Sequence, residues 1–190
     1  MSQIHEGGCL CGAVRYRTTG QPVRTTVCHC TFCQRRSGSA FAVIVYFREK
    51  DVEFTAAAPT SFEHRSDESN RWLRIEFCPR CGTTVAHTAE VFPGVRAIAG
   101  GTFDDRAWFT IERHAWTCSA CPWVVVPEGV QVFSKGSVAA IQKAVKRYVR
   151  VAGQTSSNNH PSRPDPRYPL ADEDGEENTH GRSLRWYSCL

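Results

Sequence analysis

Three cysteines lie within six residues in the segment CHCTFC, residues 28–33. Two further cysteine motifs flank this segment in the chain, with Cys9 and Cys11 in GGCLCG and Cys78 and Cys81 in FCPRCG. Thiolates are preferred zinc ligands, and short spacings of this kind let neighbouring sulfurs face one ion. The types and spacing of these cysteines therefore indicate metal chemistry.

The number of cysteines in these motifs predicts two different zinc sites. A structural zinc site uses four protein ligands, whereas a catalytic site leaves one position for water or substrate. The two outer motifs supply four sulfurs, and a structural zinc there would link distant strands; the ligands are Cys9, Cys11, Cys78 and Cys81. The central segment supplies only three, Cys28, Cys30 and Cys33, and would leave the second zinc with one open position.

Three thiolate ligands around a zinc ion would favour chemistry on a sulfur compound. The thiolates outweigh the charge of the ion, which weakens it as an activator of water, and such soft donors suit a soft external ligand. A small thiol could fill the open position as a thiolate, with its pKa lowered from about 8.5 by the metal. We therefore expect a carbon–sulfur bond to be made or broken beside an electrophile such as an aldehyde. A cytidine-deaminase site would also need a His-x-Glu segment ahead of PCxxC, which this sequence lacks.

The composition favours a cytoplasmic protein. The chain has 190 residues, ten cysteines and a formal net charge of +4. Its N-terminus does not resemble a secretory signal, and its longest apolar run, residues 40–47, is too short to span a bilayer. In a reducing compartment the thiols serve as metal ligands or reactive groups rather than disulfides. The mild charge argues against a nucleic-acid partner, and no membrane association is expected.

The cysteines must be positioned by a mainly β domain. Short runs of β-branched and aromatic residues between turn formers predict strands. These strands fall at residues 13–18, 40–47, 61–66, 72–77, 84–88, 95–99 and 109–116. Apolar residues at helical spacing predict one helix over 137–151, and the polar, proline-rich stretch after it predicts a disordered tail. We expect a zinc-binding domain over residues 1–151 and a disordered polar tail over 152–190.

The motifs resemble those of the glutathione-dependent formaldehyde-activating enzymes, whose domain is shared with centromere protein V. The matching stretches are GGCLCGAVRY (7–16), CHCTFCQRRSGS (28–39), FCPRCGTTV (77–85), AGGTFDD (99–105), RHAW (113–116) and PW (122–123). The resemblance implies several small twisted antiparallel sheets around the zinc knuckles, with a structural zinc at the outer motifs and a catalytic zinc at the central one. It also implies addition of glutathione to formaldehyde to give S-hydroxymethylglutathione, a carbon–sulfur lyase reaction in reverse.

Several other residues could contribute to the site or to the core. Arg35 and Arg36 follow the central motif, and their guanidinium groups match the carboxylates of glutathione, although solvated arginines explain the pair equally well. We expect His29 to lie beside the site or at the surface rather than to ligate, and His87 and His114 to be packing residues. Four tryptophans are expected in the core: Trp72, Trp108, Trp116 and Trp123. No carboxylate stands out as a general acid or base.

One motif, CSAC at residues 118–121, departs from the family pattern. Cys118 or Cys121 could donate an eighth sulfur, which would close the second zinc site and make it structural. A pair of thiols with no metal role is the interpretation that we favour, and a redox switch is a third possibility.

Two functions of different classes follow from these alternatives. The three-ligand count favours a zinc-dependent carbon–sulfur lyase with two zinc ions per chain, acting on a small thiol such as glutathione and an aldehyde. A closed second site would instead favour a non-catalytic zinc scaffold that binds a protein or nucleic-acid partner.

Overall fold

The structure is a computed structural model, and it describes residues 3–66 and 69–136. The helix predicted over 137–151, the tail predicted over 152–190 and the boundary between the two predicted domains lie outside these residues. Within them the fold is mainly β, as the sequence predicted. No helix in this part of the chain is long and apolar enough to cross a membrane.

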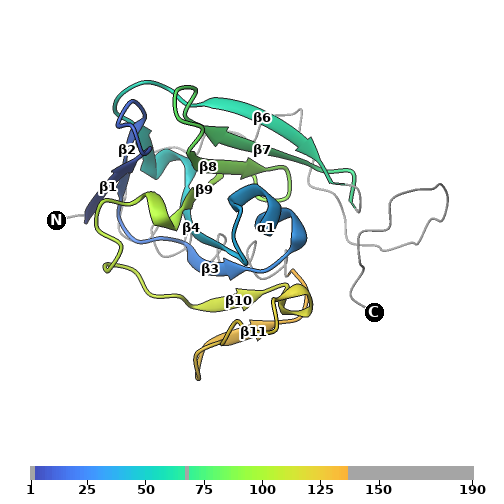
Figure 1. Cartoon of the computed structure of the whole chain (residues 1–190). Helices are drawn as coiled ribbons and strands as arrows, with labels where there is room; N and C mark the ends of the chain where they lie inside the picture. Colours follow the sequence, from blue (N-terminus) through green and yellow to red (C-terminus); the bar gives the residue numbers. More distant parts are fainter. Residues whose placement is uncertain (1–2, 67–68, 137–190) are drawn as a thin grey trace, which may run out of the picture.

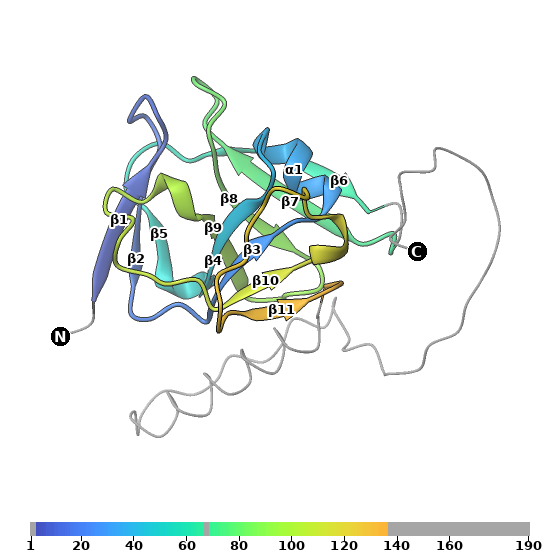
Figure 2. The same ribbon diagram turned by 60° about the horizontal axis from the view of Figure 1, so that its bottom comes forward.

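The strands form two sheets, which Figure 1 shows with labels for every strand except β5, labelled in Figure 2. The small sheet has the order β1-β2-β5, and its strands are β1 (Ile4–Gly8), β2 (Arg15–Thr19) and β5 (Val52–Phe54). The large sheet has the order β11-β10-β3-β4-β9-β8-β7-β6. Its strands are β3 (Arg24–Cys28), β4 (Ala42–Arg48), β6 (Thr60–Arg65), β7 (Trp72–Phe77), β8 (Thr84–Ala89), β9 (Val95–Ala99), β10 (Arg113–Ala115) and β11 (Gln131–Phe133). In Figure 2 the small sheet lies to the left of the large one.

The only α-helix in the described residues is α1 (Thr31–Ser37), which starts inside the CHCTFC segment. Cys30 caps its N-terminus, because the Cys30 sulfur accepts a hydrogen bond from the backbone N–H of Cys33 at 3.3 Å. Gly38 ends the helix with a φ of 62°, a left-handed conformation that favours glycine. Short 3-10 turns lie at η1 (Glu49–Asp51), η2 (Gly100–Thr102) and η3 (Thr117–Ser119).

The large sheet is mixed, which corrects the expectation of antiparallel sheets alone. β10 runs parallel to both of its neighbours, β3 and β11. Parallel pairing needs a long crossover, and residues 116–130 provide one between β10 and β11. The strand predicted over 109–116 is also shorter than expected. The backbone N–H of Glu112 donates to the side chain of Thr25 at 3.0 Å instead of to a ladder partner.

Two hydrophobic cores lie on opposite faces of the large sheet. The first core, between the two sheets, contains Phe47 and Ile98 together with Cys9 and Cys78. The second core lies beside α1 and contains Tyr46 and Ala97 together with Cys28 and Cys33. Neighbouring residues of β4 and β9 alternate between these cores, as side chains of a strand do. The outer and central cysteine motifs are therefore separated by the sheet.

Trp123 is not a core residue, contrary to the prediction. It lies in the connection between η3 and β11, and its side chain is 71% exposed. The other three tryptophans are partly buried. Trp108 packs against the first core and Trp116 against the second, while Trp72 has the guanidinium of Arg74 5.3 Å from its ring.

Candidate metal centres

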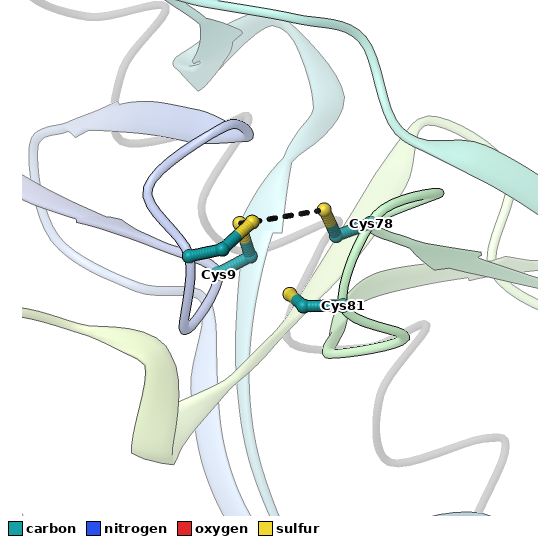
Figure 3. A group of neighbouring side chains, drawn as sticks. Cys9, Cys78 and Cys81 are labelled. Carbon is teal, nitrogen blue, oxygen red and sulfur yellow. Dashed lines mark hydrogen bonds between the residues drawn. The ribbon is translucent and has the colours of Figure 1, made fainter.

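Four thiols converge where the small sheet meets the large one. The Sγ atoms of Cys9, Cys11, Cys78 and Cys81 all lie within 4.8 Å of one another. Cys11 Sγ is 3.6 Å from Cys9 Sγ and 3.7 Å from Cys78 Sγ. Figure 3 shows the sulfurs of Cys9, Cys78 and Cys81 facing one another across the gap between two turns. The β1–β2 turn carries the first pair and the β7–β8 turn the second, so this four-thiol cluster joins the two sheets.

The separations in the four-thiol cluster fit a zinc ion. Tetrahedral zinc with Zn–S bonds of about 2.3 Å places its sulfurs about 3.8 Å apart, whereas a disulfide holds two sulfurs about 2.05 Å apart. The loops also stabilise thiolate charge. Val14 donates its N–H to Cys9 Sγ at 3.2 Å, and a hydrogen bond with the Thr83 hydroxyl lowers the pKa of Cys81 to about 5. This donor set suits zinc, which binds deprotonated thiols.

Three thiols converge on the other face of the large sheet, at the junction of β3 and α1. Cys28 ends β3, Cys30 caps α1 and Cys33 lies in its first turn, and their Sγ atoms lie within 4.8 Å of one another. Cys28 Sγ is 3.5 Å from Cys30 Sγ. Cys28 and Cys33 are 8% and 7% exposed, whereas Cys30 is only half-buried. The three-thiol cluster is therefore most accessible on the Cys30 side.

No fourth donor joins the three-thiol cluster in the part of the chain that the structure describes. Among the described residues, no other His, Cys, Asp or Glu side chain places a ligand atom in the group that the three cysteines form. Cys118 and Cys121, the residues expected to close the site if it were structural, are not members of the cluster. Cys121 is a half-buried free thiol. A zinc ion held by these three residues would keep one position for an external ligand.

The three close thiols cannot all ionise without a cation. Cys28 donates a hydrogen bond to Cys30, which raises the pKa of Cys28 well above its usual range. Hydrogen bonds from Cys28 and Cys30, with the charge of Arg36 adding to them, lower the pKa of Cys33. Only one thiolate is thus favoured among three neighbouring sulfurs, and a divalent cation would remove the repulsion that disfavours the others.

The two arginines after the cluster differ in their surroundings. Arg36 is half-buried on α1, and its side chain hydrogen-bonds the sulfur of Cys33. Arg35 is exposed on the same helix. Arg36 therefore lies against the sulfurs of the cluster, and whether either arginine binds a substrate carboxylate stays a prediction.

His29 turns away from the sulfurs that flank it. Its ring is fully buried, with Nε2 2.9 Å from Nδ1 of His114, and it does not join the three-thiol cluster. This agrees with the prediction that His29 lies beside the site and does not ligate. His87 and His114 are 7% and 5% exposed, as expected of packing residues.

The sequence missed residues that surround the three-thiol cluster. Tyr46 belongs to the same core as Cys28 and Cys33, but a tyrosine inside an apolar run gives no sign of such a position. Gln34 and Ser119 both donate hydrogen bonds to the backbone carbonyl of His29, at 2.7 and 3.0 Å. Side chains that bond to backbone atoms distant in sequence leave no spacing pattern, so nothing in the sequence points to them.

Comparisons with known proteins place the cysteine motifs in one family. No curated protein matched the chain. Among solved structures, a crystal structure of a Rhodobacter sphaeroides protein is similar at 19% sequence identity, covering 67% of this chain and 98% of that chain with a TM-score of 0.43. The family model described as glutathione-dependent formaldehyde-activating enzyme matches residues 4–119, more than half of the chain, and includes all seven clustered cysteines. The chain belongs to the family of glutathione-dependent formaldehyde-activating enzymes.

Proposed function

We propose that this protein is a zinc-dependent enzyme that adds a small thiol to an aldehyde and catalyses the reverse reaction. Glutathione and formaldehyde are the proposed pair, and S-hydroxymethylglutathione is their product. The reverse reaction breaks a carbon–sulfur bond, which makes the enzyme a carbon–sulfur lyase. Because its thiols must stay reduced to act, we place it in the cytoplasm.

The observation that carries this proposal is the difference between the two clusters. Four thiols converge on one face of the large sheet and three on the other, and no fourth donor completes the second set in the described residues. A four-thiolate zinc is saturated by protein, whereas a three-thiolate zinc can accept an external ligand. The match to a family named for glutathione and formaldehyde supports a thiol as the ligand class.

Each cluster has its own role in this proposal. Zinc at Cys28, Cys30 and Cys33 would supply the positive charge that favours a bound thiolate at neutral pH. The chain holds the three sulfurs at one point through the β3–α1 junction, and Arg36 adds positive charge beside Cys33. Zinc at Cys9, Cys11, Cys78 and Cys81 would be structural. Arg35, exposed on α1, is the proposed partner of a glutathione carboxylate.

The addition balances without a further reactant. The thiol loses its proton, and its sulfur forms a bond to the carbonyl carbon of the aldehyde. The π pair of the C=O bond moves to oxygen, which takes up a proton to give the hydroxymethyl thioether. No oxidation or reduction occurs, so neither a redox cofactor nor an oxidant is required.

Cobalt substitution tests whether a small thiol binds at the three-thiol cluster. We expect glutathione added to the cobalt-substituted protein to change the thiolate-to-cobalt charge-transfer band, because a fourth thiolate joins the metal. The measurement is a titration followed by absorbance, with Cys33→Ser as the matched variant that loses one of the three ligands. No change with glutathione at millimolar concentration, or with any other small thiol, would contradict the proposal and leave the scaffold function in its place.

A further inference from the structure

Beside Nδ1 of His29, two further buried polar atoms near the three-thiol cluster lack a hydrogen-bond partner. They are Nε of Arg36 and Nδ1 of His87, and neither finds a partner among the described residues. His87 is only 7% exposed, so water does not easily satisfy its ring. Folded proteins pair the large majority of such groups, and those left unpaired call for an explanation such as a ligand.

Arg36 and His87 come from different elements that border the second core. Arg36 lies on α1, one turn after Cys33, and hydrogen-bonds the Cys33 sulfur. His87 lies on β8, opposite Ala97 of β9, which in turn lies opposite Tyr46 of β4. Side chains directly opposite one another share a face of the sheet. His87 is therefore on the face that carries the three-thiol cluster, with its ring 6.5 Å from that of Tyr46.

Arg36 and His87 both act as hydrogen-bond donors. The guanidinium of Arg36 offers N–H donors and no acceptor. Burial, with the nearby charge of Arg36 adding to it, lowers the pKa of His87 to about 3. The imidazole is therefore neutral at physiological pH, and with its proton on Nδ1 it donates as well. The charges of Arg36 and Cys30 both act on His87, so the two donors lie in the same neighbourhood as the cluster. Two such donors complement an oxygen atom, above all one on which negative charge develops.

We propose that Arg36 Nε–H and His87 Nδ1–H bind the oxygen of the aldehyde and orient its carbon toward the thiol held at the three-thiol cluster. This inference rests on the proposed function and adds the residues that bind the electrophile. As the carbon–sulfur bond forms, the π pair moves to the oxygen, where both donors stabilise it. The oxygen then takes up a proton, and breakdown of the adduct follows the same steps in reverse.

Substitutions that remove one donor at a time test this assignment. Arg36→Met removes the guanidinium, and His87→Leu removes the ring nitrogen at similar volume. His87→Asn keeps an amide nitrogen close to the position of Nδ1. Arg71→Met, which changes an exposed arginine after the β6–β7 turn, is the matched control. Two measurements are made on each protein: glutathione binding by the cobalt band, and exchange between carbon-13 formaldehyde and its glutathione adduct by NMR.

We expect Arg36→Met and His87→Leu each to lower the catalysed exchange rate about 100-fold, the loss typical of one oxyanion donor. In His87→Leu the affinity of the cobalt protein for glutathione should change less than about threefold, because His87 contacts the aldehyde and not the thiol. With glutathione already bound, the midpoint of a formaldehyde titration of the cobalt band should rise about tenfold or more. His87→Asn should recover much of the loss, and Arg71→Met should match the wild type.

The outcomes separate this inference from the proposed function. If the wild-type cobalt protein does not bind glutathione, or binds it and does not respond to formaldehyde, the proposed function fails. If the wild type responds and both donor variants respond equally well, only the assignment of the oxygen site fails. Loss of glutathione binding in proportion to activity in His87→Leu would also overturn it, since His87 would then support the thiol.

Discussion

Alternation along an extended backbone decides which side chains of the central motif can react. Cys28 and Cys30 direct their sulfurs to the same cluster, whereas His29 between them turns to His114. Successive side chains of a strand point to opposite faces, so a ligand at every second residue is the natural spacing here. The intervening histidine is available to hold β3 against β10, and the two cysteines are available to the metal.

Arg35 offers a test of which thiol the protein prefers. We expect Arg35→Met to raise the Kd for glutathione about tenfold, because one charge-assisted hydrogen bond to a carboxylate contributes about 1.4 kcal/mol. The Kd for 2-mercaptoethanol, which has no carboxylate, should not change. Titrations of the cobalt band give both values. An equal loss for both thiols would show that Arg35 acts on the cluster and not on the carboxylate.

The grouping of the seven cysteines was predictable because their spacing leaves a pattern in the sequence. Seven cysteines at short spacings divide into four and three before any fold is known, and the structure groups the same residues in the same way. The proposed roles of Arg36 and His87 were harder to predict from the sequence, because they depend on how deeply each side chain is buried. A histidine such as His87 reads as a packing residue until its unpartnered nitrogen and its sheet face are known.

The loop after β10 is tied to the start of α1 by a small hydrogen-bond network. Gln34 on α1 donates to the carbonyls of His29 and Ser119, at 2.7 and 2.8 Å. Ser119 Oγ donates to the same His29 carbonyl and to that of Trp116, at 3.0 and 3.1 Å. The backbone N–H of His29 donates in turn to Ala115 at 2.9 Å. The central motif is thus held by contacts with a segment 85 or more residues later.

Removing this network should loosen the three-thiol cluster while the fold persists. We expect Ser119→Ala to lower the free energy of unfolding by about 1 kcal/mol, a typical value for a lost hydrogen bond. A chelator should also remove one metal equivalent faster than from the wild type, while the other is retained. Denaturation and timed metal release measure the two effects. Ser61→Ala, on the exposed strand β6, is the control, and an equal change there would contradict the assignment.

Strands with a clear pattern of apolar residues could be predicted from the sequence. Strands that form only by pairing with distant residues could not. The strand over residues 95–99 and the strand over 72–77 have the predicted bounds. β3 is buried along its whole length, so it lacks the alternation that marks a half-buried strand. β5, β10 and β11 have three residues each, too few to show a period, and their pairing depends on residues far away in sequence.

The two cysteine clusters differ in which parts of the fold they connect. The four-thiol cluster connects the turn after β1 with the turn after β7, and so joins the small sheet to the large one. The three-thiol cluster lies within one short segment and joins no separate parts. A metal at the first site should therefore stabilise the whole fold, whereas a metal at the second should mainly serve the reaction.

Substitution of one ligand in each cluster should separate these roles. We expect Cys78→Ser to lower the free energy of unfolding by at least about 3 kcal/mol and the Tm by about 10 °C or more, because structural zinc contributes directly to folding. Cys33→Ser should lower the zinc content from about two ions to about one with a much smaller change in Tm. Calorimetry and metal analysis test this, and equal losses of Tm would refute it.

The spacing of the ligands along the chain also orders the events of synthesis. The thiols of Cys11 and Cys78 are 67 residues apart, so their site cannot close until both turns have left the ribosome and met. The thiols of CHCTFC lie within six residues and can capture an ion long before that. On the proposed function, the nascent chain would acquire its reactive metal before the metal that secures the fold. Whichever thiol-seeking ion is most abundant at that moment has the first opportunity to occupy the reactive centre.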